Sequence, residues 1–238
     1  MKPSYSPYSE TISTLLEAIL PHVVFDGWGD DSFAAAVADT EIDSDLAHAA
    51  CPRGGLDLAI AFHRAGDLAM VGALESAELS DMRFRDKVAH AVWLRLQSIE
   101  DKEAVRRGTT LFALPHLAPE GAKLIWETAD HIWTALGDTS EDINWYSKRA
   151  TLSGVYASTV LFWLGDESLD SGATRSFLDR RIDNVMQIEI AKAKARENPL
   201  LKPLTQGLER AFSVVKAPNT APRTDVPGRW DPQETGQK

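Results

Sequence analysis

The residues best suited to specific chemistry stand together at 142–149, in the run Asp-Ile-Asn-Trp-Tyr-Ser-Lys-Arg. This run follows a helix stop at Gly137 and opens a new apolar helix. Tryptophan, tyrosine and arginine anchor many protein interfaces because they combine apolar area with directed hydrogen bonds. The pattern therefore indicates a surface that recognises another molecule. A purely structural interpretation stays open, in which Trp145 only covers the end of a helical bundle.

Motifs that carry enzymatic or metal chemistry are missing from the sequence. It contains no Gly-x-Ser-x-Gly, no phosphate-binding P-loop, no dinucleotide-binding glycine fingerprint and no Glu-x-x-His of a di-iron bundle. Glu127, Asp130 and His131 share one side of an expected helix, but we expect His131 to bond to its neighbours rather than to a metal. The prediction is a protein without catalysis, cofactor or metal, with an unrecognised lipid-modifying site as one alternative.

The composition is that of an acidic globular protein. Its 238 residues are 44% hydrophobic and carry a net charge of -10. The single cysteine, Cys51, excludes an internal disulfide and fits a reducing compartment. No run reaches the roughly 18 apolar residues that a membrane-spanning helix needs. The first residues show neither the apolar run of a signal peptide nor the Arg-rich pattern of a transit peptide.

Almost every periodic segment of the chain predicts a helix. The expected helices are 9–24, 31–38, 44–50, 55–75, 81–99, 102–114, 119–136, 145–164 and 171–195. Short helices followed by long ones are typical of a helix-turn-helix unit joined to a helical ligand-binding bundle. We therefore predict an all-α fold in four parts: a helix-turn-helix-like unit at 1–52, a bundle at 53–195, an amphipathic helix at 196–216 and a disordered tail at 217–238.

The charge distribution argues against DNA binding by the first part. Residues 1–60 carry ten acidic side chains and two cations, a net charge of -8. The candidate recognition helix, 44–50, has no Arg, Lys, Asn or Gln for base edges. Phosphate would be repelled by such a surface. We expect no nucleic-acid partner, and a transcriptional regulator with a hydrophobic effector is the alternative interpretation.

An amphipathic pattern near the end of the chain reverses the local charge. Between residues 192 and 216 six cations stand against two acids, a net charge of +4. On a helix, one stripe is apolar and the opposite face carries Lys202 and Arg210. The apolar stripe consists of Leu201, Leu204, Leu208, Phe212 and Val215. This pattern predicts binding to an anionic membrane surface, and the alternative is a final helix packed on the bundle.

Two of the expected bundle helices are rich in large apolar side chains. These are Leu124, Ile125, Ile132, Trp133 and Leu136 in the first, and Leu152, Val155, Tyr156, Val160 and Trp163 in the second. Such residues either fill a solid core or line a cavity for a long apolar ligand. Periodicity alone does not separate these two interpretations.

Three local sequences, at 137–149, 152–156 and 177–186, resemble the ubiquinone-biosynthesis accessory lipid-binding proteins of mitochondria and alphaproteobacteria. Weaker matches lie at 52–55 and 89–95. The resemblance implies a fold like that of the TetR regulators, a homodimer and the loss of DNA binding. It also implies a non-catalytic role, in which an isoprenoid lipid or quinone precursor is bound and presented to the di-iron demethoxyubiquinone hydroxylase at a membrane surface.

The resemblance also assigns roles to residues. The surface that meets the hydroxylase falls on the run at 142–149, and the expected partner contacts are Asp142, Asn144, Trp145, Tyr146, Lys148 and Arg149. The ten large apolar residues of the two bundle helices are the expected lipid contacts, and the stripe at 199–216 with its cations is the expected membrane contact. Because no targeting peptide is apparent, we expect a bacterial cytoplasm with peripheral association to the inner membrane.

Overall fold

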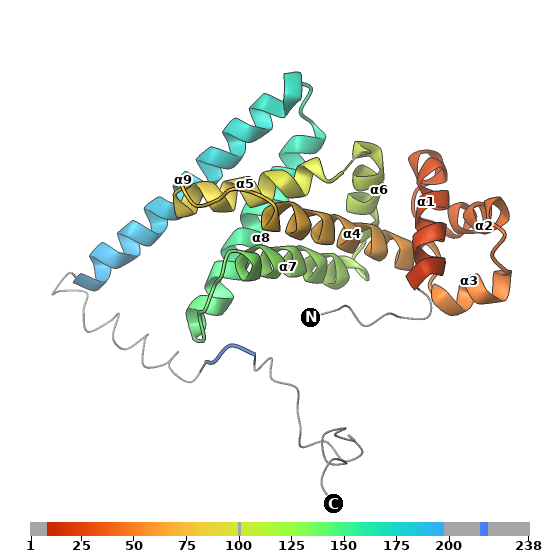
Figure 1. Cartoon of the computed structure of the whole chain (residues 1–238), viewed down its shortest axis with the longest axis horizontal. Helices are drawn as coiled ribbons and strands as arrows, with labels where there is room; N and C mark the ends of the chain where they lie inside the picture. Colours follow the sequence, from red (N-terminus) through yellow and green to blue (C-terminus); the bar gives the residue numbers. More distant parts are fainter. Residues whose placement is uncertain (1–8, 100, 198–214, 219–238) are drawn as a thin grey trace, which may run out of the picture.

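The structure, a computed structural model, describes residues 9–99, 101–197 and 215–218, and every regular element in them is helical (Figure 1). The elements are α1 (Ser9–Asp26), α2 (Asp30–Asp39), α3 (Ser44–Ala50), α4 (Gly55–Glu75), α5 (Phe84–Gln97), α6 (Lys102–Phe112), α7 (Ala118–Ala135), α8 (Ile143–Leu164), a 3-10 turn (Leu169–Ser171) and α9 (Gly172–Glu197). The predicted all-α class is confirmed. Most of the predicted amphipathic helix and tail lies outside the described residues.

Local sequence explains where these helices begin and end. Asp43, Asp101 and Asp142 precede α3, α6 and α8, and the side chain of each accepts a backbone N–H of the first turn. Gly137 ends α7 with a φ of 79°, which brings the Asp138 N–H to 2.9 Å from the Trp133 carbonyl oxygen. The predicted boundaries differ most at α5, which begins at Phe84 rather than at residue 81 because a turn precedes it.

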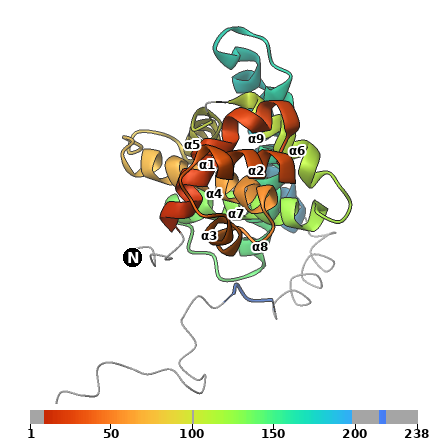
Figure 2. The ribbon, with the colours of Figure 1, turned by 90° about the vertical axis from the view of Figure 1, so that its right-hand side faces the viewer.

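Two clusters of buried side chains hold the described helices together. One is built from α1, α2, α3, the first half of α4 and Ala104 of α6. The other joins the second half of α4 to α5, α7, α8 and α9. Helix α4 takes part in both, with Leu58 in the first cluster and Met70 in the second. Figure 1 shows α1, α2 and α3 grouped at one end, and Figure 2 views the molecule from that end.

Candidate functional site

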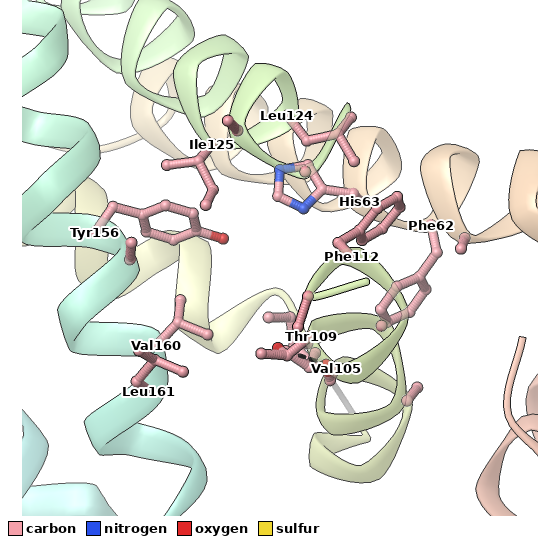
Figure 3. Close-up of a pocket in the computed structure, with 18 of the residues that line it drawn as sticks. Phe62, His63, Val105, Thr109, Phe112, Leu124, Ile125, Tyr156, Val160 and Leu161 are labelled. Carbon is pink, nitrogen blue, oxygen red and sulfur yellow. Dashed lines mark hydrogen bonds between the residues drawn. The ribbon is translucent and has the colours of Figure 1, made fainter. Parts of the chain in front are cut away.

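A cavity of about 460 Å³ lies within the bundle, with α4, α6, α7 and α8 as its main walls (Figure 3). Its lining is mostly apolar, with Phe62, Val105, Phe112, Ile125 and Leu161 as the larger contributors. Pockets of this size and character bury most of the surface of a small ligand. The arrangement therefore suits an apolar chain, which gains about 2.5 kcal/mol for each ~100 Å² of surface removed from water.

A network of buried polar side chains lies behind one wall of this cavity. Its centre is Asp67 of α4, which is 0% exposed. Asp67 Oδ1 accepts hydrogen bonds from Arg95 Nε at 2.6 Å and from the Thr128 hydroxyl at 2.9 Å. The Thr128 hydroxyl is also hydrogen-bonded to His63 Nε2 at 2.9 Å, and His131 Nδ1 lies 3.5 Å from Asp67 Oδ2. These polar contacts link α4, α5 and α7, and the Arg95 guanidinium packs over the Tyr156 ring of α8.

The environment of this network shifts the pKa values of its members. Burial and the Arg95 charge lower the pKa of His63 to about 4, so its ring is neutral at pH 7. Burial alone would raise the pKa of Asp67, but contacts with His131, His63 and Arg95 outweigh it and lower that pKa. The contact with Asp67 raises the pKa of His131. Arg95 and Asp67 therefore face each other as a charged pair in the interior.

Arg95 is accommodated by the glycine beside it. A Cβ atom at position 66 would lie 2.5 Å from Arg95 Nη1, which is closer than such atoms can approach. Gly66 therefore leaves the space that the guanidinium occupies. Arg95 Nη2 donates to the His63 carbonyl oxygen at 2.9 Å, whereas Nη1 is buried and has no hydrogen-bond partner among the described residues.

The predicted lipid contacts divide among three places. Leu124, Ile125, Tyr156 and Val160 line the cavity. Trp133, Leu152 and Val155 line a smaller cavity of about 190 Å³ bounded by α5, α7, α8 and α9. Ile132, Leu136 and Trp163 line neither and pack in or against the core. The sequence reasoning missed the walls that α4 and α6 supply, because helices that meet only in the fold leave no joint pattern in the sequence.

The run at 142–149 forms an aromatic surface cluster together with α7. Trp145 and Tyr146 of α8 stack edge to face at 4.8 Å, and Trp126 of α7 lies 5.9 Å from Trp145 and 6.4 Å from Tyr146, between ring centroids. We call Trp126, Trp145 and Tyr146 the aromatic patch. The sequence reasoning did not include Trp126. Asp142 and Asn144 are exposed beside the patch.

The two cations of the run, Lys148 and Arg149, form ion pairs with acidic residues of the same chain. Arg149 is 2% exposed; its guanidinium carbon lies 3.9 Å from the Trp145 ring centroid, and it donates to Asp138 at 3.0 Å and to Asp130 at 2.5 Å. Lys148 Nζ donates to Asp138 at 2.7 Å. Although burial opposes it, hydrogen bonds from Lys148, Ser140 and Arg149 lower the pKa of Asp138 to about 2. Arg149 therefore packs against the Trp145 ring as a buried residue and is not an exposed contact.

A short segment from the end of the chain lies against the same region. The Tyr146 hydroxyl donates to the Lys216 carbonyl oxygen at 3.2 Å, and the Ala217 N–H donates to the Glu141 carbonyl oxygen at 2.9 Å. Val215 is the one predicted membrane contact within the described residues, and it is half-buried. The other predicted membrane contacts, Leu201, Lys202, Leu204, Leu208, Arg210 and Phe212, lie outside them.

Comparison with known proteins connects this geometry to a family. The family model described as COQ9 matches residues 118–189, which include α7, α8 and much of α9. The predicted resemblance to that family is confirmed. The matched span supplies two walls of the cavity and the whole aromatic patch.

Curated relatives carry the same family name. The ubiquinone biosynthesis protein COQ9-A, mitochondrial, of Xenopus laevis is 29% identical over 76% of this chain and 60% of its own length. The COQ9 protein of Homo sapiens is 30% identical over 63% of this chain and 45% of its own length. The COQ9 protein of Drosophila melanogaster is 26% identical over 84% of this chain and 60% of its own length. The chain therefore spans 60% or less of these three relatives.

A solved structure confirms the TetR-like fold. The TetR transcriptional regulator from Nitrosomonas europaea ATCC 19718 superposes with a TM-score of 0.61 at 19% identity, over 73% of this chain and 97% of that chain. At this identity the likeness shows the fold alone.

The expected location is corrected by the same comparison. The COQ9 relatives from Xenopus laevis, Rattus norvegicus, Bos taurus, Homo sapiens and Drosophila melanogaster are named as mitochondrial, which contradicts the expectation of a bacterial cytoplasm with inner-membrane association. That expectation relied only on the pattern of the first residues, which does not carry such a conclusion. Among the described residues, no helix has the length and apolar character needed to cross a bilayer.

Proposed function

We propose that this chain is a non-catalytic, lipid-binding accessory protein of ubiquinone biosynthesis. The observation that carries the proposal is the cavity of about 460 Å³ whose lining is mostly apolar, built partly from the region that matches COQ9. The relatives are named as ubiquinone biosynthesis proteins, and the intermediates of that pathway carry isoprenoid tails that water solvates poorly. In the proposed role the cavity shelters such a tail.

The aromatic patch is proposed as the docking surface for the di-iron demethoxyubiquinone hydroxylase. Trp145 is held in place by Arg149 beneath it and by Trp126 and Tyr146 beside it, so little side-chain freedom is lost on binding. Asp142 and Asn144 add exposed polar groups at its edge. This combination of a rigid aromatic centre and a polar rim is typical of interfaces.

Two further parts of the proposal rest on sequence. The apolar stripe and the cations of 199–216 are proposed to bind an anionic membrane surface, which brings the cavity close to the lipid that it takes up. The chain is proposed to act as a homodimer, as the resemblance implies. We propose no nucleic-acid partner, because α3 carries no lysine or arginine and Asp43 and Asp45 are exposed on it or beside it.

Native mass spectrometry of the protein purified with membranes present, followed by extraction and identification of lipids, tests the proposal. We expect the protein to carry isoprenoid or quinone lipids. Ala157→Phe places a phenyl ring at a half-buried position of the cavity wall and should expel them. The same change at the exposed Ala150 of α8 is the control and should leave them bound. A lipid-free wild type, or equal loading of Ala157→Phe, contradicts the cavity as the binding site.

A further inference from the structure

One wall of the cavity is polar, and a hydrocarbon tail does not explain it. His63, Arg95 and Tyr156 all line the cavity, beside the network centred on Asp67. An isoprenoid tail accepts no hydrogen bonds, so apolar side chains would serve it better. Buried polar groups are costly unless they are paired. The polar wall therefore points to a ligand group that offers hydrogen-bond partners.

Arg95 supplies the first donor. Its guanidinium carries five N–H groups, and the structure uses Nε for Asp67 and Nη2 for the His63 carbonyl oxygen. The side chain is 3% exposed; Nη1 is buried beside Gly66 without a hydrogen-bond partner among the described residues, and Nη2 keeps a second N–H beyond the one it gives to the His63 carbonyl oxygen. The Asp67 contact fixes the orientation of the guanidinium at the cavity wall, so its N–H groups are held in place before any ligand arrives.

Tyr156 supplies the second donor. Its hydroxyl points into the cavity, toward the side on which His63 lies (Figure 3). The residue is 3% exposed, and burial raises the pKa of the phenol, so its proton stays in place at neutral pH. The guanidinium carbon of Arg95 lies 5.9 Å from the Tyr156 ring centroid, which places both donors at the same end of the cavity.

The charges at this wall decide which head group fits. Arg95 is the one lysine or arginine among the described residues that line the cavity, and Asp67 neutralises it at 2.6 Å. A phosphate or carboxylate head would bring a net negative charge into a cavity whose described lining residues offer no free cation to balance it. An uncharged oxygen, such as a carbonyl, accepts hydrogen bonds without that cost.

We propose that Arg95 and Tyr156 recognise the uncharged oxygen of a lipid head group, of the kind a quinone carbonyl provides, while the apolar walls hold its tail. This inference rests on the proposed lipid-binding function and adds the residues that select the head group. Gly66 is part of the same head-group site, because a side chain there would displace the Arg95 guanidinium.

Displacement of the fluorescent probe ANS from the purified full-length protein tests the proposal with three ligands. Decylubiquinone has an uncharged quinone head, decylbenzene has the same tail on a ring without oxygen, and palmitate has an anionic head. We expect wild type to prefer decylubiquinone over decylbenzene, and to bind palmitate more weakly than decylubiquinone. Tyr156→Phe and Arg95→Lys should each reduce the preference for the quinone by about two- to tenfold, the effect of one hydrogen bond.

Controls separate the head-group site from the pocket. Arg83→Lys makes the same change as Arg95→Lys on the surface, where the Arg83 side chain is 77% exposed, and should leave the preference unchanged. Tyr156→Phe keeps the buried ring and is expected to fold. Its effect on the preference for the quinone therefore tests the head-group site even if circular dichroism shows that Arg95→Lys does not fold. Equal binding of decylubiquinone and decylbenzene by wild type, or tighter binding of palmitate, overturns the head-group proposal and leaves the lipid pocket standing. Failure of all three ligands to displace ANS overturns the proposed function together with it.

Discussion

Replacing Asp67 with asparagine should cost the fold about 3–5 kcal/mol, because it leaves the Arg95 charge buried without its counter-charge. The side chains of Asp67 and Arg95 are 0% and 3% exposed and meet at 2.6 Å, so water cannot take over for the lost carboxylate. The same change also weakens the hydrogen bond that Thr128 donates to Asp67. For a protein of ordinary stability this is a large share of the free energy of unfolding.

Urea unfolding followed by far-ultraviolet circular dichroism measures this loss. The matched control is Asp86→Asn, which removes the partner of Arg83 at 2.7 Å on the surface, where Arg83 is 77% exposed. That pair should contribute less than about 1 kcal/mol. A difference of less than about 1 kcal/mol between the two variants would refute the view that the Asp67–Arg95 pair is an interior electrostatic anchor of the cavity wall.

Three further predictions concern pH, the partner and the membrane. The pKa of His63 falls from 6.5 to about 4 on folding, so the unfolded chain binds one more proton between these pH values, and the free energy of unfolding should drop as the pH falls from 6.5 to 4. His63→Gln should flatten this pH dependence. The comparison is made as the difference from wild type, because His131 acts in the opposite direction. Trp145→Lys should weaken hydroxylase binding in a pull-down titration by about thirtyfold or more while lipid loading persists, and loss of both would make Trp145 a core residue. Leu204→Asp with Leu208→Asp should reduce sedimentation with anionic liposomes, whereas Gln206→Asp should not, and equal sedimentation of all variants would end the membrane proposal.

The helices could be predicted from the sequence because their signals are local. Gly137, Asp142 and the apolar periodicity of 143–164 each act within a few residues of where they stand. The exposure of single side chains was harder to predict. Arg149 is buried because Asp130 and Asp138 from the preceding helix and turn surround it, and that meeting is a property of the tertiary fold.

The cavity was predictable in part for the same reason. The apolar content of α7 and α8 indicated two of its walls, but not those from α4 and α6, nor the polar one. A signal for the polar wall was present in the sequence: Asp67 follows His63 by one helical turn, between the apolar runs 58–62 and 68–71 of the same helix, where a charged residue needs a partner. Its partner Arg95 lies 28 residues later in the sequence, and no local pattern indicates that the two residues meet.

The cavity and the aromatic patch are built on the same two helices, and this has a thermodynamic consequence. On α7, Ile125 lines the cavity while its neighbour Trp126 belongs to the patch; on α8, Tyr156 and Trp145 take the same two roles. A partner that docks on the patch is therefore separated from the bound lipid by α7, a helix about 10 Å across. If lipid raises the affinity for the hydroxylase by some factor, the hydroxylase must raise the affinity for lipid by the same factor. The change in decylubiquinone affinity caused by the partner and the change in partner affinity caused by decylubiquinone should be the same factor. A factor of one in both measurements would mean that the shared helices hold two independent sites.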